Sequence, residues 1–85
     1  MSRYFFHLDG HESVIDDEGL ELPDHQHAKM QALHTMGEML RFERPNFWDT
    51  RQLKMIVTDQ SGLILFVLDL SAIEAPAIAS ANRKA

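Results

Sequence analysis

The stretch QLKMIVTDQSGLILFVLDL, residues 52–70, predicts a β-hairpin around which the rest of the fold can be arranged. Two apolar runs flank Asp59-Gln60-Ser61-Gly62, which has the composition of a type I turn with glycine in the left-handed bulge position. In that register one face carries Leu53, Met55, Val57, Leu63, Leu65 and Val67. The other face carries Lys54, Ile56, Thr58, Ile64, Phe66 and Leu68.

A second pair of strands is predicted at the N-terminus. RYFFHLD, residues 3–9, is short, aromatic-rich and closed by Asp9-Gly10, a strong turn signal. SVIDD, residues 13–17, is expected to return as the second strand, with Gly19 forming a bend before LEL. His7 and Asp16 then share a face of the sheet, close enough to form a hydrogen-bonded pair.

One amphipathic helix is predicted between the strand pairs, over residues 25–42. Asp24 is a good N-cap, because its carboxylate can accept a hydrogen bond from a free amide of the first turn, and Pro45 ends the pattern. The apolar stripe comprises Ala28, Ala32, Leu33, Met36, Met39 and Leu40. We expect Leu33, Met36 and Leu40 to anchor the helix on the sheet.

The element order predicts an α+β fold of ββαββ type, a four-stranded antiparallel sheet with one long helix packed on one face. Residues 1–70 are expected to form a single domain, and residues 71–85 a C-terminal tail that is partly ordered or frayed. The first and fourth strands are apolar on both faces, so they are expected at the centre of the sheet. The acidic second strand is expected at an edge.

One helix can cover only one face of such a sheet. The opposite face is predicted to expose an apolar patch, with Phe5, Ile56, Ile64, Phe66 and Leu68 as candidate interface residues. A second copy of the chain is the preferred cover, through a two-fold face-to-face or edge-to-edge arrangement. The alternative cover is the chain's own tail, through Ile73 and Ile78.

Composition narrows the class of protein. A content of 45% hydrophobic and 25% charged residues is that of an ordinary globular chain, and the absence of cysteine excludes disulfides, thiolate zinc sites and cysteine nucleophiles. No apolar run is long enough to span a bilayer and no signal peptide is recognisable, so we expect a cytoplasmic protein without membrane contact. The net charge of −5 is uneven, because residues 1–27 hold seven acids against Arg3 alone.

Several short motifs together resemble a family of small bacterial proteins classed as a domain of unknown function. The motifs are Arg3-Tyr4-Phe5-Phe6, Asp16-Asp17-Glu18-Gly19, Leu22-Pro23-Asp24, and Val57-Thr58-Asp59 with Gly62. The family is frequent in rhizobia and related alphaproteobacteria, and its members usually begin RYFF or RYYF and carry a DxxGxELPD segment. The resemblance covers residues 3 to about 70 and implies no activity, cofactor or site.

A basic and aromatic segment offers one candidate site. RFERPNFWDTRQLK, residues 41–54, interleaves cations with aromatic rings, which is the composition of a surface for phosphates and stacked bases. The candidate residues are Arg41, Arg44, Trp48, Arg51 and Lys54. Against this, the chain is acidic, with a pI near 5.4, and Phe47 and Trp48 can instead plug the end of a small core.

The histidines of the predicted helix offer another candidate site, for a metal ion. His34 and Glu38 lie one turn apart and His27 lies on the same face, but HExxH and EF-hand spacings are absent. A solvated helix face is the favoured interpretation.

The leading interpretation is a non-enzymatic, cytoplasmic, homodimeric interaction or regulatory module without a cofactor, because no nucleophile or oxyanion-type donor set accompanies the His7–Asp16 pair. An additional protein partner stays open. The runner-up is a small nucleic-acid-associated protein that uses residues 41–54. A weaker alternative is metal binding through the helix histidines.

Overall fold

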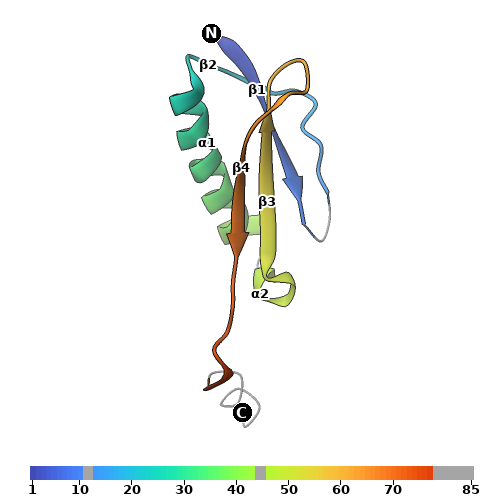
Figure 1. Ribbon diagram of the computed structural model, residues 1–85, viewed down its shortest axis with the longest axis vertical. Coiled ribbons are helices and arrows are strands. Elements are labelled where there is room, and N and C mark those ends of the chain that lie inside the picture. Colours follow the sequence, from blue (N-terminus) through green and yellow to red (C-terminus); the bar gives the residue numbers. More distant parts are fainter. Residues whose placement is uncertain (11–12, 44–45, 78–85) are drawn as a thin grey trace.

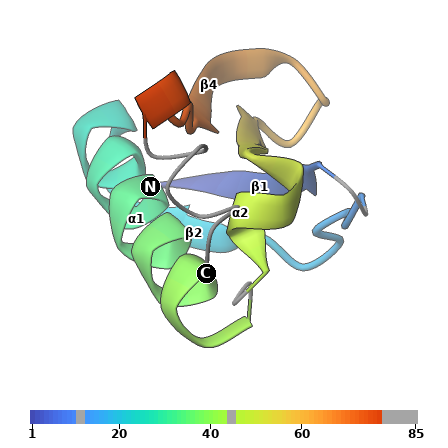
Figure 2. The ribbon, with the colours of Figure 1, turned by 90° about the horizontal axis from the view of Figure 1, so that it is seen from below.

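The computed structural model describes residues 1–10, 13–43 and 46–77. The elements are β1 (Ser2–Asp9), β2 (Leu20–Leu22), α1 (His25–Glu38), η1 (Met39–Glu43), α2 (Phe47–Thr50), β3 (Gln52–Thr58) and β4 (Ile64–Ser71). The strands form one antiparallel sheet in the order β2-β1-β3-β4, and α1 lies on one side of it (Figures 1 and 2). The predicted α+β class is confirmed.

The core lies between α1 and the two central strands. The pairs Phe6–Val57 and Leu8–Met55 place alternate side chains of β1 and β3 on the helix face. The fully packed core consists of Tyr4, Leu8, Ala28, Ala32, Met36, Leu53, Met55 and Val57. Ala28 and Ala32 have almost no exposed surface. Because their side chains are so short, the backbone of α1 can lie close to the sheet.

The turn of the second hairpin forms as predicted. The Gly62 amide donates to the Asp59 carbonyl at 3.1 Å, and Gly62 has a φ of 90°, in the left-handed region. The Asp59 carboxylate accepts hydrogen bonds from the Ser61 hydroxyl and from the amides of Ser61 and Leu63. These bonds hold the pKa of Asp59 below its usual value, and the bond from the Ser61 hydroxyl has the largest effect.

The predicted assignment of β4 side chains to faces was wrong beyond the turn. Thr58 pairs with Ile64, but Val57 pairs with Phe66, so one extra residue, Leu65, is inserted between the pairs. Because side chains alternate along a strand, that insertion reverses the faces that follow it. Phe66 and Leu68 therefore face the helix, and Val67 faces the opposite side with Ile56.

Two further expectations about the sheet were wrong. SVIDD does not form a strand: Val14 makes one isolated bridge to Leu8, and the second strand is LEL, residues 20–22. β4 lies at an edge rather than at the centre, whereas the placement of β1 at the centre was correct; the other edge is formed by β2 and not by the predicted acidic strand. Residues 11–12, at the tip of the predicted first turn, lie outside the described residues.

The helix begins as predicted and is anchored differently. The Asp24 carboxylate accepts the His27 amide at 2.9 Å, and hydrogen bonding to His27 lowers the pKa of Asp24. Met36 is buried and Leu40 half-buried, as expected. Leu33, however, is 63% exposed, because its flank of α1 faces β4, the edge strand. Pro45, the predicted stop, lies outside the described residues.

The described part of the tail does not cover the sheet. The Ala72 amide donates to the Arg51 carbonyl at 2.9 Å, after which residues 73–77 continue away from the sheet along the long axis (Figure 1). Ile73 is 90% exposed, and Ile78 lies outside the described residues. None of the helices in residues 1–10, 13–43 and 46–77 is long and apolar enough to cross a membrane.

Gly19 is the position where a side chain should be least tolerated. Its φ is 73°, and a Cβ atom would lie 2.8 Å from Phe5 Cε2 and 3.0 Å from the Tyr4 carbonyl oxygen. We expect Gly19→Ala to lower the free energy of unfolding by about 1–3 kcal/mol, measured by urea denaturation. Gly37→Ala is the matched control, since a Cβ on this helical glycine meets nothing within 4 Å and should stabilise by about 0.5–1 kcal/mol. Equal stability of the two variants would contradict this account.

Candidate interaction surface

A carboxylate replaces a strand along the outer edge of β1. Leu8 pairs with Val14 and Tyr4 with Leu20, and between them the Phe6 amide donates to Asp16 Oδ2 at 3.0 Å. Asp16 Oδ1 also accepts the amides of Glu18 and Gly19, each at 3.1 Å. The acidic segment thus satisfies backbone donors that a regular ladder would have satisfied.

Asp16 is held as an anion by this arrangement. Burial by itself would raise the pKa of Asp16, but the three backbone hydrogen bonds outweigh it and, with the nearby His7 ring, lower the pKa below its usual value. The carboxylate consequently serves as a fixed acceptor rather than as a proton donor.

His7 contacts Asp16 as predicted, but through the backbone. His7 Nδ1 accepts the Asp16 amide at 3.1 Å, so the proton of the neutral ring is on Nε2, which lies 3.1 Å from Thr58 Oγ1 and donates to it. A protonated Nε2 cannot remove a proton from the Thr58 hydroxyl. His7 therefore joins β1, β3 and the acidic segment instead of activating a nucleophile.

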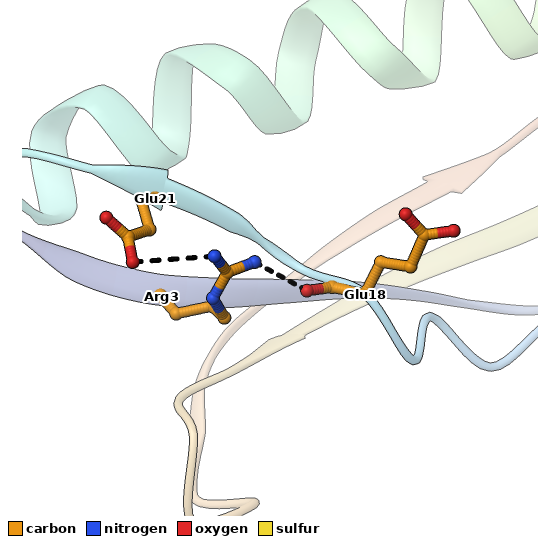
Figure 3. A network of polar contacts seen from close by, with 3 residues as sticks. All are labelled: Arg3, Glu18 and Glu21. Atoms are coloured by element: carbon orange, nitrogen blue, oxygen red, sulfur yellow. Dashed lines mark hydrogen bonds and ion pairs between the residues drawn. The ribbon is translucent and has the colours of Figure 1, made fainter.

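Arg3 of β1 binds two residues of the following segment, Glu18 and Glu21 (Figure 3). Its guanidinium donates to the Glu18 carbonyl at 2.6 Å and to Glu21 Oε1 at 3.4 Å. The pair with Glu21 is exposed and contributes little to stability. The shorter bond to the Glu18 carbonyl joins β1 directly to the backbone just before Gly19.

The helix histidines are paired locally. His34 Nε2 lies 2.7 Å from Glu38 Oε1, and His27 Nδ1 lies 2.8 Å from Asp24 Oδ1. His27 is thus held at the helix start rather than beside His34. Within the described ranges, no three or more His, Cys, Asp or Glu side chains group so that they could hold a metal ion.

The basic candidates do not form one patch. Arg41 lines a hollow of about 510 Å³ on the outer side of α1, together with Leu33, His34, Gly37, Glu38 and Phe42. Lys54 lines a different hollow, of about 390 Å³. In the sheet, Lys54 pairs with Asp9 of β1 and with Asp69 of β4. The strand register thus places an aspartate beside Lys54 on each neighbouring strand.

The remaining members of the basic segment lie near α2. Arg51 has a φ of 61° and ends α2, and its Nε donates to the Trp48 carbonyl at 3.2 Å. Phe47 packs against the core, as expected of a plug, whereas Trp48 is 56% exposed. Arg44 lies outside the described residues.

The predicted interface residues divide between two surfaces. Phe5, Ile56 and Ile64 belong to the sheet face opposite α1, which we call the open face; there the rings of Phe5 and His7 stack with centroids 6.4 Å apart. Phe66 and Leu68 belong instead to a hollow of about 300 Å³ between α1 and β4. This β4 groove is lined by Lys29, Ala32, Leu33, Phe66, Val67 and Leu68. Sequence reasoning missed it, because neither the bulge nor the edge position of β4 is visible in the hydrophobic pattern.

These features define a small α+β fold with one helical layer on one side of a four-stranded sheet. The chain belongs to the family described as a domain of unknown function (DUF6894), whose model matches residues 3–71, from β1 to the end of β4. No curated protein and no solved structure gives a significant match.

Asp16→Asn tests the role of the carboxylate. The amide side chain keeps one acceptor oxygen and presents a donor to the other backbone amides, so we expect a loss of about 1–3 kcal/mol in the free energy of unfolding at pH 7. Because the pKa of Asp16 is lower in the folded chain, its contribution is complete above about pH 4 and is lost as the pH falls through the folded pKa.

The difference between wild type and Asp16→Asn should therefore shrink below about pH 4 in urea titrations. Asp17→Asn, at an exposed neighbouring position, is the control and should stay within about 0.5 kcal/mol of wild type. A difference that persists unchanged at pH 2 would argue against the carboxylate as the cause.

Proposed function

We propose that this chain is a non-enzymatic module that associates with a second copy of itself and acts through interaction or regulation. The observation that supports this most strongly is the group of exposed apolar side chains on β4, the edge strand, and on the flank of α1 beside it. Ile64, Val67 and Leu33 are 58%, 48% and 63% exposed. Apolar surface of this kind, gathered on a small domain, is typical of interaction sites.

A second copy is favoured over the chain's own tail. Residues 73–77 lead away from the sheet (Figure 1), and Ile73 is 90% exposed. In a two-fold dimer one patch is buried twice, once on each subunit, so a single apolar surface suffices. An additional protein partner remains compatible with this arrangement, and a cytoplasmic setting fits a chain without cysteine.

The absence of enzymatic activity is proposed from what the titratable side chains contact. Asp16 is occupied by three backbone amides, and the Nε2 proton of His7 is donated to Thr58. Thr58 itself is only 7% exposed. The groups best placed for acid/base work are therefore used to hold the fold.

Nucleic acid ranks behind a protein partner. Arg41 and Lys54 line separate hollows, and Lys54 lies in register between two aspartates. A surface that binds the phosphate backbone of a nucleic acid needs several cations along one groove. Metal binding ranks lower still, because His27 and His34 are held by different carboxylates.

Light scattering over a dilution series tests self-association directly. We expect a mass near twice the 9.8 kDa of the chain at micromolar concentration and above. A chain shortened by residues 74–85 should keep that mass, since residues 73–77 lead away from the sheet (Figure 1). A monomeric mass for both chains at every concentration would refute the proposal.

A further inference from the structure

The two edges of the sheet are finished in different ways. The outer edge of β1 is covered by β2, by the Val14 bridge and by the Asp16 carboxylate. The outer edge of β4 is eight residues long, and neither lysine, arginine nor proline occurs in it. Proteins usually block a long apolar edge with such residues, because its unpaired backbone groups can bind another strand.

The register identifies the backbone groups that β4 presents outward. Leu8 directs its N–H and C=O to Val14, so Met55, opposite Leu8, directs its own toward β4, where it pairs with Leu68. Val67 and Asp69 flank Leu68 and therefore direct their N–H and C=O groups away from β3, to the edge that pairs with no other strand of the described residues.

Apolar side chains adjoin that edge on the helix side. Phe66 and Leu68 are half-buried, and Leu33 of α1, which lines the β4 groove with them, is 63% exposed. Lys29 lines the same groove and can carry its ammonium group to solvent on its long stem. A strand added at the edge would place its own helix-side residues beside this groove.

We propose that β4 pairs edge to edge with the β4 of a second copy, antiparallel about a two-fold axis at Val67. This joins two four-stranded sheets into one sheet of eight strands, with both helices on the same side. The inference rests on the proposed self-association and specifies the surface that carries it.

The β4 strand of a second copy matches this edge at Val67 and at the residues on either side of it. In this register Val67 forms a hydrogen-bonded pair with Val67 of the partner subunit, and Phe66 lies opposite Leu68 of the partner subunit on the helix side. An unrelated extended peptide would satisfy the backbone equally, but it would supply that apolar pair only by chance. A second copy supplies it by symmetry.

Charge selects the register. Asp69 is the one charged residue of β4, and an axis at Asp69 would place two carboxylates directly opposite each other. With the axis at Val67 the two Asp69 residues are four positions apart along the strands, about 13 Å. That exceeds the screening length of about 8 Å at physiological salt, so their repulsion is small.

Two matched variants distinguish the edge from the open face. Val67→Pro removes an outward N–H and leaves the inward pairing of Leu68 in place, so it should reduce the mass by light scattering to one chain. Ile56→Lys, on the open face but on the inner strand β3, should leave the dimer intact. Circular dichroism checks that each variant is folded. If Val67→Pro is unfolded, Val67→Lys, which sets two cations against each other at the axis, should halve the mass.

Hydrogen exchange gives an independent measurement on the wild type. The amide of Val67 should be protected at high protein concentration and lose that protection on dilution, whereas the Leu68 amide stays protected throughout. Protection of the Val67 amide in a monomer at every dilution would assign the edge to the chain's own tail and overturn the inference.

The remaining outcomes separate the two proposals. A wild-type dimer that survives Val67→Pro and Val67→Lys overturns edge pairing while self-association stands, and loss of the dimer in Ile56→Lys would then assign the open face. A wild type that is monomeric at all concentrations overturns both proposals.

Discussion

The rest of the structure depends on the capture of the Phe6 amide by the Asp16 carboxylate. β1 is a central strand and contributes Tyr4 and Leu8 to the core, so its outer backbone groups need partners. By accepting that amide and those of Glu18 and Gly19, Asp16 lets a strand of only three residues complete the edge. The same contacts direct the chain from the bend at Gly19 to the helix start at Asp24.

The sequence predicted those features that depend on a few neighbouring residues. The Asp59–Gly62 turn and the Asp24 cap follow from local hydrogen bonds, and both formed as expected. The side-chain faces of β4 were not predicted correctly, because the bulge at Leu65 cannot be recognised in the hydrophobic pattern. Of the candidate interface, Phe5, Ile56 and Ile64 were placed on the correct face, whereas Phe66 and Leu68 were not. The exposure of Leu33 depends on strand order, which no local rule supplies.

Closeness in sequence also failed to predict which charged side chains lie together in the folded chain. Arg41 and Lys54 belong to one basic segment, yet one ends up on the outer side of a helix and the other on the open face of β3. There the strand register, which was not predictable, places Lys54 between Asp9 and Asp69. Opposite charges on neighbouring strands favour the sheet, so the register gives Lys54 a role in the fold that the basic segment alone does not indicate.

The position of α1 links the small core to the exposed edge. Ala28 and Ala32 bring the helix close to the sheet, and the core beneath it is drawn from β1 and β3, which leaves Phe66 and Leu68 of β4 only half-buried. Backbone hydrogen bonds along an added strand contribute little net free energy, whereas each 100 Å² of apolar surface buried contributes roughly 2.5 kcal/mol. Association costs at least about 4 kcal/mol. The β4 groove must therefore supply most of the free energy for edge pairing, while the strand backbone supplies its register.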